Sequence, residues 1–256
     1  MNHSINMKLL IAVLILFTGH NLYAFNFTEQ IIFDYEYSPY AYNANQTQRS
    51  PLPQSQKVRL EDRQRCFKLV KNELTRYPQK ILKIILDKVV ILSEIQFEKS
   101  NDSYAGLAYY KAIFIKCNRN RDAFNTQLTL HHEISSLLIS DIFNLGFNFD
   151  QFLALNINGS DSYLTPENFF GPNTSPEVAN FFGLSISPKM NKRGFLTEYS
   201  HTDLLNDVNM IAEYLMVTPG ELNNVINYPV VRNKINFVRE FYKRLGIKID
   251  EHLINF

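Results

Sequence analysis

The sequence predicts an α+β fold, in which a small mixed sheet packs on one apolar helix and a mostly helical C-terminal lobe follows. Three observations support this prediction. Residues 60–86 carry apolar side chains at helical spacing, residues 89–117 contain two β-rich segments, and residues 127–145 form a strongly apolar helical pattern. Helical spacing returns from residue 200 onward. Strands that form a block between helices, instead of alternating with them, are typical of the α+β class.

The first 24 residues predict a secretory signal peptide. Lys8 precedes an apolar run from Leu9 to Phe17, and a short polar stretch then ends at Ala24. A basic flank, an apolar stretch of this length and a final small residue are the parts of a signal peptide, with cleavage after Ala24. The run has roughly half of the ~20 residues that a membrane span needs, so an uncleaved anchor is the weaker interpretation. We therefore expect a secreted or periplasmic protein with no membrane span after cleavage.

The remaining chain is expected to form a short lead-in and one domain. Residues 25–56 are polar and rich in Tyr and Asn, which predicts an extended or loosely ordered segment. Residues 57–256 are expected to form a single domain, with an N-lobe at 57–146 and a C-lobe at 147–256. The net charge is +1 and no basic stripe is interleaved with aromatic residues, which argues against nucleic acid as a partner. The sequence sets no oligomeric state.

Two cysteines, Cys66 and Cys117, are the only ones in the chain. An exported protein enters an oxidising compartment, so a disulfide between them is the favoured interpretation. The alternative is two separate buried thiols, since Cys is among the most buried residue types.

The N-lobe elements follow one another closely, with a polar turn at 99–103 between the two β-rich segments and a helix end near Gly146. The predicted N-lobe elements are helices at 56–77 and 81–86, strands at 89–97 and 106–117 (with its core at 112–117), and a helix at 127–145.

The C-lobe begins with a loop-rich stretch, residues 147–200, of a kind that is usually functional or disordered, and we expect it to form a lid over a cleft. A helix is then expected from Ser200, because Ser200 and Asp203 have the spacing of a capping box with Asp in place of Glu. Pro219 ends that helix, and further helices are expected around 220–227 and 229–245.

The most informative motif is His132-Glu133 within the apolar helix. In the pattern H-E-x-x-H, two histidines at i and i+4 bind zinc from one helical face, and the Glu beside the first removes a proton from the metal-bound water. His132 and Glu133 fit the first ligand and the base. A strand directly upstream, here 112–117, would form the edge along which a peptide substrate lies. The alternative is a His-Glu pair that satisfies a buried hydrogen-bond network.

Ser136 occupies the position of the second histidine, and a serine hydroxyl is a poor zinc ligand. His131 cannot replace it, because adjacent helical side chains diverge by about 100°. The C-terminal helix offers further candidates. Asn209 and Glu213 share a face at i and i+4, and Glu213 is either a ligand or a solvated acid. The other candidates are Asp203, for which capping is favoured, Asp207, which lies closer to the apolar face, and His201, which either supplies the missing imidazole or is a surface residue beside a cap.

The order of these elements resembles that of the secreted zinc metallopeptidases of the gluzincin type, over roughly residues 60 to 216. The residues that carry the resemblance are the predicted turn Ala105-Gly106-Leu107-Ala108, the His132-Glu133 helix, the segment from Gly194 to Ser200, and Ala212-Glu213. The resemblance implies a zincin-like fold around an active-site helix.

The same resemblance implies roles for individual residues. His132 would be a zinc ligand, Glu133 the base, Glu213 a ligand or the carboxylate that orients one, and Tyr199 a candidate for stabilising the oxyanion. The chain departs from the family pattern twice. Ser136 stands in place of the second His, and Asn209 stands where an acidic residue is expected.

Three functions therefore compete. The first is an exported zinc peptidase that uses His132, Glu213 and one further ligand, with Glu133 activating water. The second is a catalytically inactive relative, a pseudoenzyme that binds a peptide or protein in the retained cleft. The third is a secreted structural domain. Glu133 favours the first function, because a binding module needs no general base. The missing histidine favours the second, because a zinc site needs three or four protein ligands.

Overall fold

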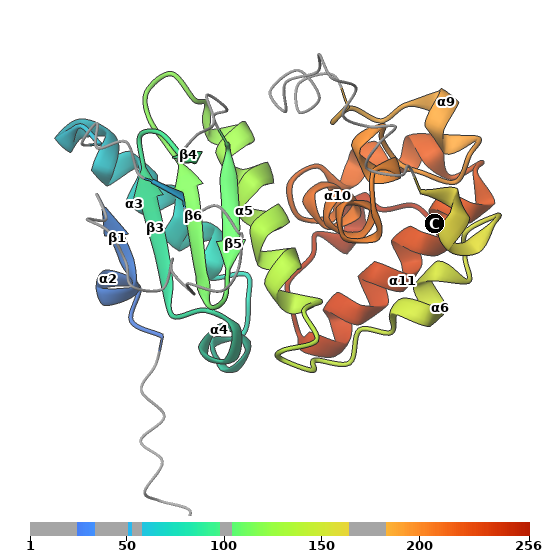
Figure 1. Cartoon of the computed structure of the whole chain (residues 1–256), viewed down its shortest axis with the longest axis horizontal. Helices are drawn as coiled ribbons and strands as arrows, with labels where there is room; N and C mark the ends of the chain where they lie inside the picture. The colour runs from blue at the N-terminus through green and yellow to red at the C-terminus, as the bar shows by residue number, and fades with distance from the viewer. Residues whose placement is uncertain (1–24, 34–50, 53–57, 98–103, 164–182) are drawn as a thin grey trace, which may run out of the picture.

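The structure is a computed structural model of the chain that describes residues 25–33, 51–52, 58–97, 104–163 and 183–256. The expected signal peptide lies outside these residues, as does most of the expected lead-in. Figure 1 shows a sheet flanked by helices beside a group of helices from the C-terminal part of the chain. The α+β prediction is confirmed at this level. Among the described residues, no helix has both the length and the apolar character that a membrane span requires.

Two helices precede the strand at residues 88–92, as predicted, with tighter bounds. Helix α3 spans Leu60–Leu74 and buries Cys66, Val70 and Leu74 along one stripe. Helix α4 spans Gln79–Ile85, and Pro78 is its N-cap residue. Proline is favoured at a helix start because its fixed φ suits the first turn and its missing N–H has no partner there.

The main sheet has the strand order β1-β3-β6-β5. Strands β1 (Ile31–Phe33), β3 (Lys88–Leu92) and β6 (Ala112–Lys116) are parallel, and β5 (Gly106–Tyr109) runs antiparallel to β6. A separate pair joins β2 (Pro51–Leu52) to β4 (Gln96–Phe97). Strand β1 comes from the segment expected to be a lead-in. It follows a short helix, α2 (Phe27–Gln30).

The predicted edge strand is wrong. Residues 112–116 form β6, which lies between β3 and β5, and the end position among the described strands belongs to β5. The segment predicted as a turn, from Ala105 to Ala108, therefore contributes most of β5. A two-residue connection, with Tyr110 at φ 56°, folds β5 back beside β6. The buried run Ile113-Phe114-Ile115 is typical of a strand covered on both faces.

The helix with the His-Glu pair, α5, spans Ala123–Leu138 and lies between the sheet and the C-terminal helices (Figure 1). It begins four residues earlier than predicted because Asp122 caps it: the Asp122 side chain accepts a hydrogen bond from the Asn125 amide at 2.7 Å. It ends at Leu138, before turns that lead to Gly146.

The central C-terminal helix, α10, also begins differently from the prediction. Asp203 is its N-cap, accepting from the Asn206 amide at 2.8 Å, whereas Ser200 bonds to Thr197. The capping interpretation of Asp203 is confirmed, and the capping box starting at Ser200 is wrong. The described helical elements of this part are α6 (Phe149–Leu153), η2 (Gly159–Ser162), α9 (Pro188–Asn191), η3 (Tyr199–His201), α10 (Leu204–Val217), η4 (Pro219–Val225), α11 (Pro229–Leu245) and η5 (Glu251–Leu253).

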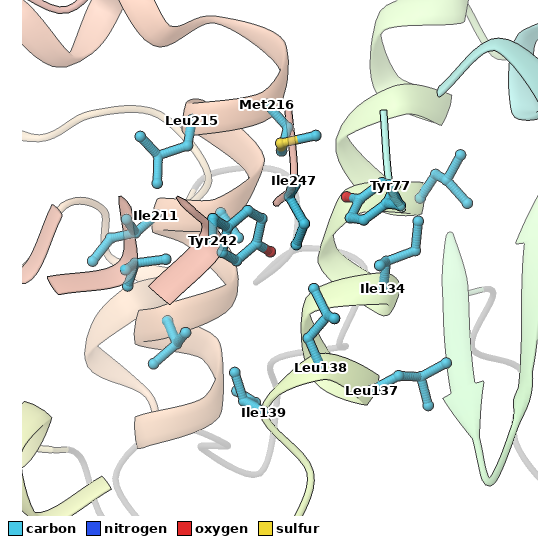
Figure 2. Packing of buried hydrophobic residues seen from close by; sticks show 14 of the residues in the cluster. Tyr77, Ile134, Leu137, Leu138, Ile139, Ile211, Leu215, Met216, Tyr242 and Ile247 are labelled. Atoms are coloured by element: carbon cyan, nitrogen blue, oxygen red, sulfur yellow. The ribbon is translucent and has the colours of Figure 1, made fainter. Parts of the chain in front are cut away.

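The core is densest where α5 packs against α10, with side chains of α11 beside them. Figure 2 shows Ile134 and Leu138 of α5 beside side chains of α10, α11 and the segment after α11. Ile134, Leu138, Leu215 and Tyr242 are all fully buried. Burial of such side chains contributes about 1.5–3 kcal/mol each, so this interface fixes α5 and α10 side by side.

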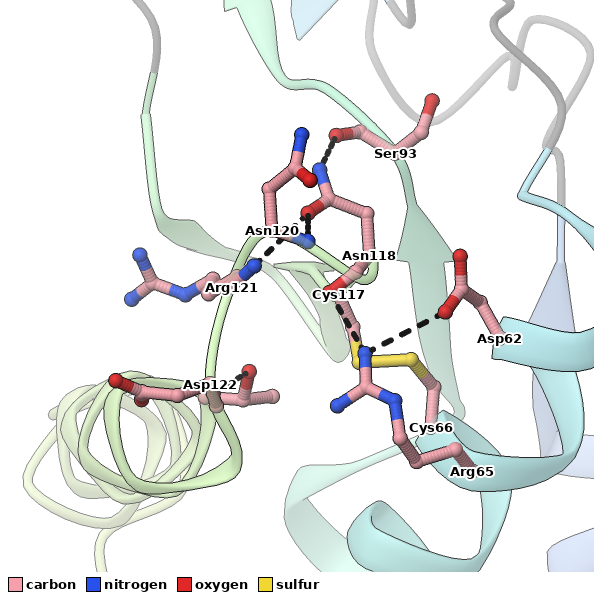
Figure 3. Close-up of a disulfide and its surroundings, with 10 residues drawn as sticks. Asp62, Arg65, Cys66, Ser93, Cys117, Asn118, Asn120, Arg121 and Asp122 are labelled. Atoms are coloured by element: carbon pink, nitrogen blue, oxygen red, sulfur yellow. Dashed lines mark hydrogen bonds and ion pairs between the residues drawn. A yellow bond between two sulfur atoms is a disulfide. The ribbon is translucent and has the colours of Figure 1, made fainter.

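A disulfide joins Cys66 of α3 to Cys117 at the end of β6 (Figure 3), which confirms the favoured pairing. The neighbouring Arg65 guanidinium donates to the Asn118 carbonyl at 2.6 Å and lies 3.7 Å from the Asp62 carboxylate. These contacts tie helix α3 to the strand that leads into α5.

Candidate functional site

The candidate site lies where α5 faces α10. His132 and Ser136 stand one turn apart on α5, and Asn209 and Glu213 stand one turn apart on α10. The His132 Nδ1 atom lies 2.5 Å from the Glu213 Oε1 atom, a charge-assisted hydrogen bond in which the ring donates. Only 15% of the His132 side chain and 6% of the Glu213 side chain are exposed. The pair is therefore held in a largely dry interface.

The other ring nitrogen of His132 faces a polar pair that contains no second imidazole. The Asn209 Nδ2 atom lies 3.3 Å from the His132 Nε2 atom and donates to the Ser136 hydroxyl at 2.7 Å. In this arrangement the His132 proton is on Nδ1, and Nε2 accepts from the amide. The Asn209 side chain thus fills the space between the two positions where the H-E-x-x-H pattern carries histidines.

The protonation of His132 is governed by its carboxylate partner. Burial opposes the charged imidazole, but the hydrogen bond and charge of Glu213 outweigh it and raise the pKa of His132. Burial likewise raises the pKa of Glu213 against the stabilising contact with His132. The Asn209 Oδ1 atom is buried without a partner among the described residues. A half-turn of that amide would let Oδ1 accept a hydrogen bond from the Nε2–H group of a charged His132.

Glu133 points to the sheet instead of to α10. Burial raises its pKa to about 7, while His132 and a hydrogen bond from the Ala108 amide act in the opposite direction. Strand β5 approaches α5 closely here. A Cβ atom on Gly106 would lie 2.4 Å from the Thr129 Cγ2 atom and 3.0 Å from the Glu133 Oε1 atom. A glycine is therefore needed at residue 106 for the strand to reach the carboxylate.

The backbone of β5 faces two ways. The Lys116 amide donates to the Ala105 carbonyl, and the antiparallel ladder then alternates along the strand. Because of this alternation, the backbone N–H and C=O groups of Leu107 and Tyr109 point toward β6. Those of Gly106 and Ala108 point away from it. The Ala108 amide on the outer side is the one that Glu133 accepts.

Tyr199, the candidate for stabilising an oxyanion, lies beside this group. Its ring centroid is 6.0 Å from that of His132, and its hydroxyl shares a hydrogen bond with Asn206. Burial, with the charges of Glu133 and Asp203, raises the pKa of Tyr199 well above its usual value. Its hydroxyl is therefore protonated at neutral pH and available as a donor.

The structure does not bring His201 to this group. Its Nε2 atom lies 3.0 Å from the Arg193 guanidinium, and its ring packs against Phe195 with centroids 4.6 Å apart. Burial and the Arg193 charge lower the pKa of His201. Asp207, another candidate, bonds instead to the buried Lys234 ammonium at 2.7 Å.

Sequence reasoning missed the partners of His131. Its Nδ1 atom lies 2.6 Å from the Tyr77 hydroxyl, and its Nε2 atom lies 3.0 Å from the Glu73 carboxylate. Glu73 lies in the last turn of α3, whereas Tyr77 lies three residues beyond the end of that helix. No local spacing links them to His131, because Tyr77 and Glu73 lie 54 and 58 residues before it.

The residues present do not fit a zinc ion. Within the described residues, no group of three or more His, Cys, Asp or Glu side chains is placed to hold a metal. The Nε2 atom of His132 faces a serine hydroxyl and an asparagine amide, and Glu213 is bonded to Nδ1. A carboxylate on the far ring nitrogen is the partner that orients a ligating histidine, so only one of the required ligands remains.

Comparison with known proteins gives little further guidance. No family model matches the chain, and no curated protein matches it. A crystal structure of a "putative zinc-binding metallo-peptidase" from Bacteroides caccae is similar over 98% of this chain and 91% of that chain, with a TM-score of 0.45 and 13% sequence identity. At this level of similarity, the shared features do not extend to a demonstrated site or activity.

Proposed function

We propose that this chain is an exported, metallopeptidase-like protein that binds an extended peptide or protein segment along β5 without zinc-dependent hydrolysis. One observation carries the proposal: the Asn209 amide lies against the His132 Nε2 atom and bonds to Ser136. The lone pair that a zinc ion would use already accepts a hydrogen bond. Two of the three ligand positions carry side chains that zinc does not favour.

The outer edge of β5 supports the peptide-binding part of the proposal. Gly106 and Ala108 direct backbone groups away from β6, and the Glu133 carboxylate accepts a hydrogen bond from the Ala108 amide. The Gly106 amide and the two carbonyls remain oriented to pair with an added strand. An extended segment that joins a sheet edge gains affinity from such main-chain hydrogen bonds.

The proposed export rests on the N-terminal pattern and on the disulfide. Cys66 and Cys117 are bonded to each other, and disulfides persist mainly in oxidising compartments. Both features agree with a secreted or periplasmic location.

A second candidate, the active zinc peptidase, is favoured by one observation. Glu133 is a carboxylate with a pKa of about 7 beside an imidazole, which is the value that suits a general base at neutral pH. This candidate requires a metal ligand set that the described residues do not supply.

The zinc content of four purified proteins distinguishes the two candidates: the wild type, His132→Ala, a double variant, and that double variant with His132→Ala added. After zinc loading and removal of free metal, we expect no stoichiometric zinc in the wild type. We expect close to one zinc per chain in Ser136→His/Asn209→Glu, because this double substitution restores an imidazole and a carboxylate opposite Nε2. Adding His132→Ala to the double variant should abolish binding. Stoichiometric zinc in the wild type that His132→Ala removes would overturn the proposal and establish the peptidase candidate.

The peptide-binding part has its own test. Unstructured ten-residue peptides are selected from a displayed library against the wild type, and the enriched peptides are titrated into isotope-labelled protein. We expect the largest amide shifts at Gly106–Tyr109. Enriched peptides that leave these four amide signals unchanged would contradict pairing along β5.

A further inference from the structure

A pocket lies in the C-terminal helical part, on a different face of α10 from the Glu213 face that meets His132. It is a pocket of about 390 Å³, within the size range of small-ligand sites. Tyr214 of α10 lies in its wall, one residue after Glu213, and adjacent helical side chains diverge by about 100°. The lining residues that matter for its chemistry are Ser185, Asn191, Tyr214, Glu221, Asn224 and Tyr228.

The described lining of this pocket carries negative charge. Among the described residues that line it, Glu221 is the one that carries a charge, and none is Lys, Arg or His. Within the part of the chain that the structure describes, the Glu221 carboxylate has no cationic partner and no side-chain hydrogen bond. The pocket therefore presents an uncompensated negative charge.

The buried wall of the pocket presents an acceptor. Asn191 is only 3% exposed, and its Nδ2 atom donates to the Phe195 carbonyl at 2.9 Å and to the Leu196 carbonyl at 3.0 Å. Both amide hydrogens are thereby used. The Asn191 Oδ1 atom is the remaining polar end of a side chain that lines the pocket, and it has no partner among the described residues.

Two tyrosines complete the chemistry. The Tyr214 hydroxyl donates to the Leu184 carbonyl at 3.0 Å, which fixes the ring. Burial and the Glu221 charge raise the pKa of Tyr214 to about 12, so the phenol stays neutral. Tyr228 lines the same pocket. The faces of neutral tyrosine rings attract cations through the ring quadrupole.

We propose that this pocket binds a cationic side chain of a polypeptide, a lysine ammonium or an arginine guanidinium. Glu221 supplies the charge, the largely buried Asn191 side chain supplies an acceptor oxygen, and Tyr214 and Tyr228 supply aromatic rings in the lining. This site is separate from the proposed strand-binding edge. It is tested with small molecules that do not need that edge, so the failure of one proposal leaves the other standing.

The test is a titration of isotope-labelled protein with three probes, N-acetyl-lysine amide, N-acetyl-arginine amide and the neutral N-acetyl-norleucine amide. We expect the two cationic probes to shift the amide signals of residues 221–228 and to bind at least about three-fold more tightly than the neutral probe. Tighter binding of the arginine probe identifies a guanidinium as the preferred cation, and tighter binding of the lysine probe identifies an ammonium. Equal affinity for the charged and neutral probes would overturn the proposal.

Two variants separate the charge from the rings. Glu221→Gln keeps the size of an exposed side chain and should weaken the cationic probes about three- to five-fold, in the range of an exposed ion pair, while leaving the neutral probe unchanged. Glu240→Gln is the matched control, since it removes an exposed carboxylate on α11 that does not line the pocket. Tyr228→Leu should also weaken the cationic probes. Unchanged affinity in Glu221→Gln, or an equal loss in Glu240→Gln, would contradict the proposed site.

Discussion

His131 and His132 are neighbours on α5, yet their surroundings differ in every respect. His131 is fully buried and bonds to Tyr77 and Glu73 of the α3 region. His132 faces α10, where it contacts Glu213 and Asn209, and it retains some solvent exposure. Because adjacent helical side chains diverge by about 100°, one residue serves the N-terminal packing and the next serves the interface with α10.

The difference lies in how completely each network is satisfied. Both ring nitrogens of His131 have partners, and Glu73 also accepts from Gln127 at 2.6 Å. Burial opposes the Glu73 charge, but the contacts with His131, Gln127 and Arg76 hold its pKa at about 2. Arg76 continues the network to the Met216 carbonyl and to Asp250 at 3.2 Å. The hydrogen bonds around His131 and Arg76 therefore connect the N-terminal part of the molecule to its C-terminal helices.

The His132 side is open by comparison. The Asn209 Oδ1 atom lacks a partner among the described residues, and Ser136 and His132 are only partly buried. A network that is satisfied throughout contributes stability, whereas one with a spare acceptor can change partners at little cost. We therefore assign a structural role to the first histidine and a site role to the second.

The largest expected effect is that of His131→Ala. The substitution leaves a cavity and removes a partner from both the Tyr77 hydroxyl and the Glu73 carboxylate. We expect the free energy of unfolding in urea to fall by about 3–5 kcal/mol. The matched variant His132→Ala should cost only about 1–2 kcal/mol, since solvent reaches its site and Glu213 can take up a proton. Equal losses in the two variants would contradict the division of roles.

The raised pKa of Glu133, which is the neighbour of His132, predicts that the free energy of unfolding depends on pH. Its folded-state pKa is raised from 4.5 to about 7, so the folded protein keeps this proton longer than the unfolded chain does. The resulting stabilisation is complete below pH 4.5 and is lost as the pH rises through 7. At about 1.4 kcal/mol per unit, the loss is at most about 3 kcal/mol.

Glu133→Gln keeps the shape and the acceptor for the Ala108 amide but does not titrate. We expect the difference in unfolding free energy between variant and wild type to increase from pH 4.5 to pH 8, measured by urea denaturation at each pH. Parallel curves for the two proteins would show that Glu133 ionises normally, and would remove the observation that favours the peptidase candidate.

Gly106→Ala tests the third face of α5, where β5 approaches. The added methyl group would lie 2.4 Å from the Thr129 Cγ2 atom, which costs about 1–3 kcal/mol of overpacking. Thr129→Ser deletes that atom and keeps the hydroxyl that bonds to Arg121 and the Asn125 carbonyl. We expect the double variant to recover most of the loss. Additive effects in this double-mutant cycle would place the clash elsewhere.

The sequence predicted those features that depend on local spacing. The helix with His132 and Glu133 and the shared face of Asn209 and Glu213 were accessible from residue types and intervals. The Cys66–Cys117 pairing was accessible on a different ground, the oxidising compartment that the N-terminal pattern predicts. The orientation of Glu213 toward Nδ1 was not, because Glu213 lies 81 residues after His132 and the two helices that carry them must first be placed side by side.

The failed predictions also depend on contacts between residues that are far apart in the sequence or on how the chain folds back. The edge position of β5 depends on the hairpin folding back beside β6, and a two-residue connection without glycine gave no signal for it. The partners of His131 lie 54 and 58 residues upstream. Adjacent histidines look alike in a sequence, and only the packing of α5 between two other helices makes them different.

The smallest expected effect also lies on the His132 side. Ser136→Ala removes the acceptor of the 2.7 Å bond from Asn209, but the amide keeps its contact with His132, and residue 136 is only partly buried. We expect a loss of about 1 kcal/mol or less in the free energy of unfolding. In a double-mutant cycle with Asn209→Ala, the coupling should be about 0.5–1 kcal/mol. Tyr77→Phe, which removes a fully buried hydroxyl from the His131 network, is the comparison and should cost more. A larger loss of unfolding free energy in Ser136→Ala than in Tyr77→Phe would mean that the hydrogen bond between Asn209 and Ser136 is mainly structural. The hydrogen bonds around His132 would then stabilise the fold as strongly as those around His131.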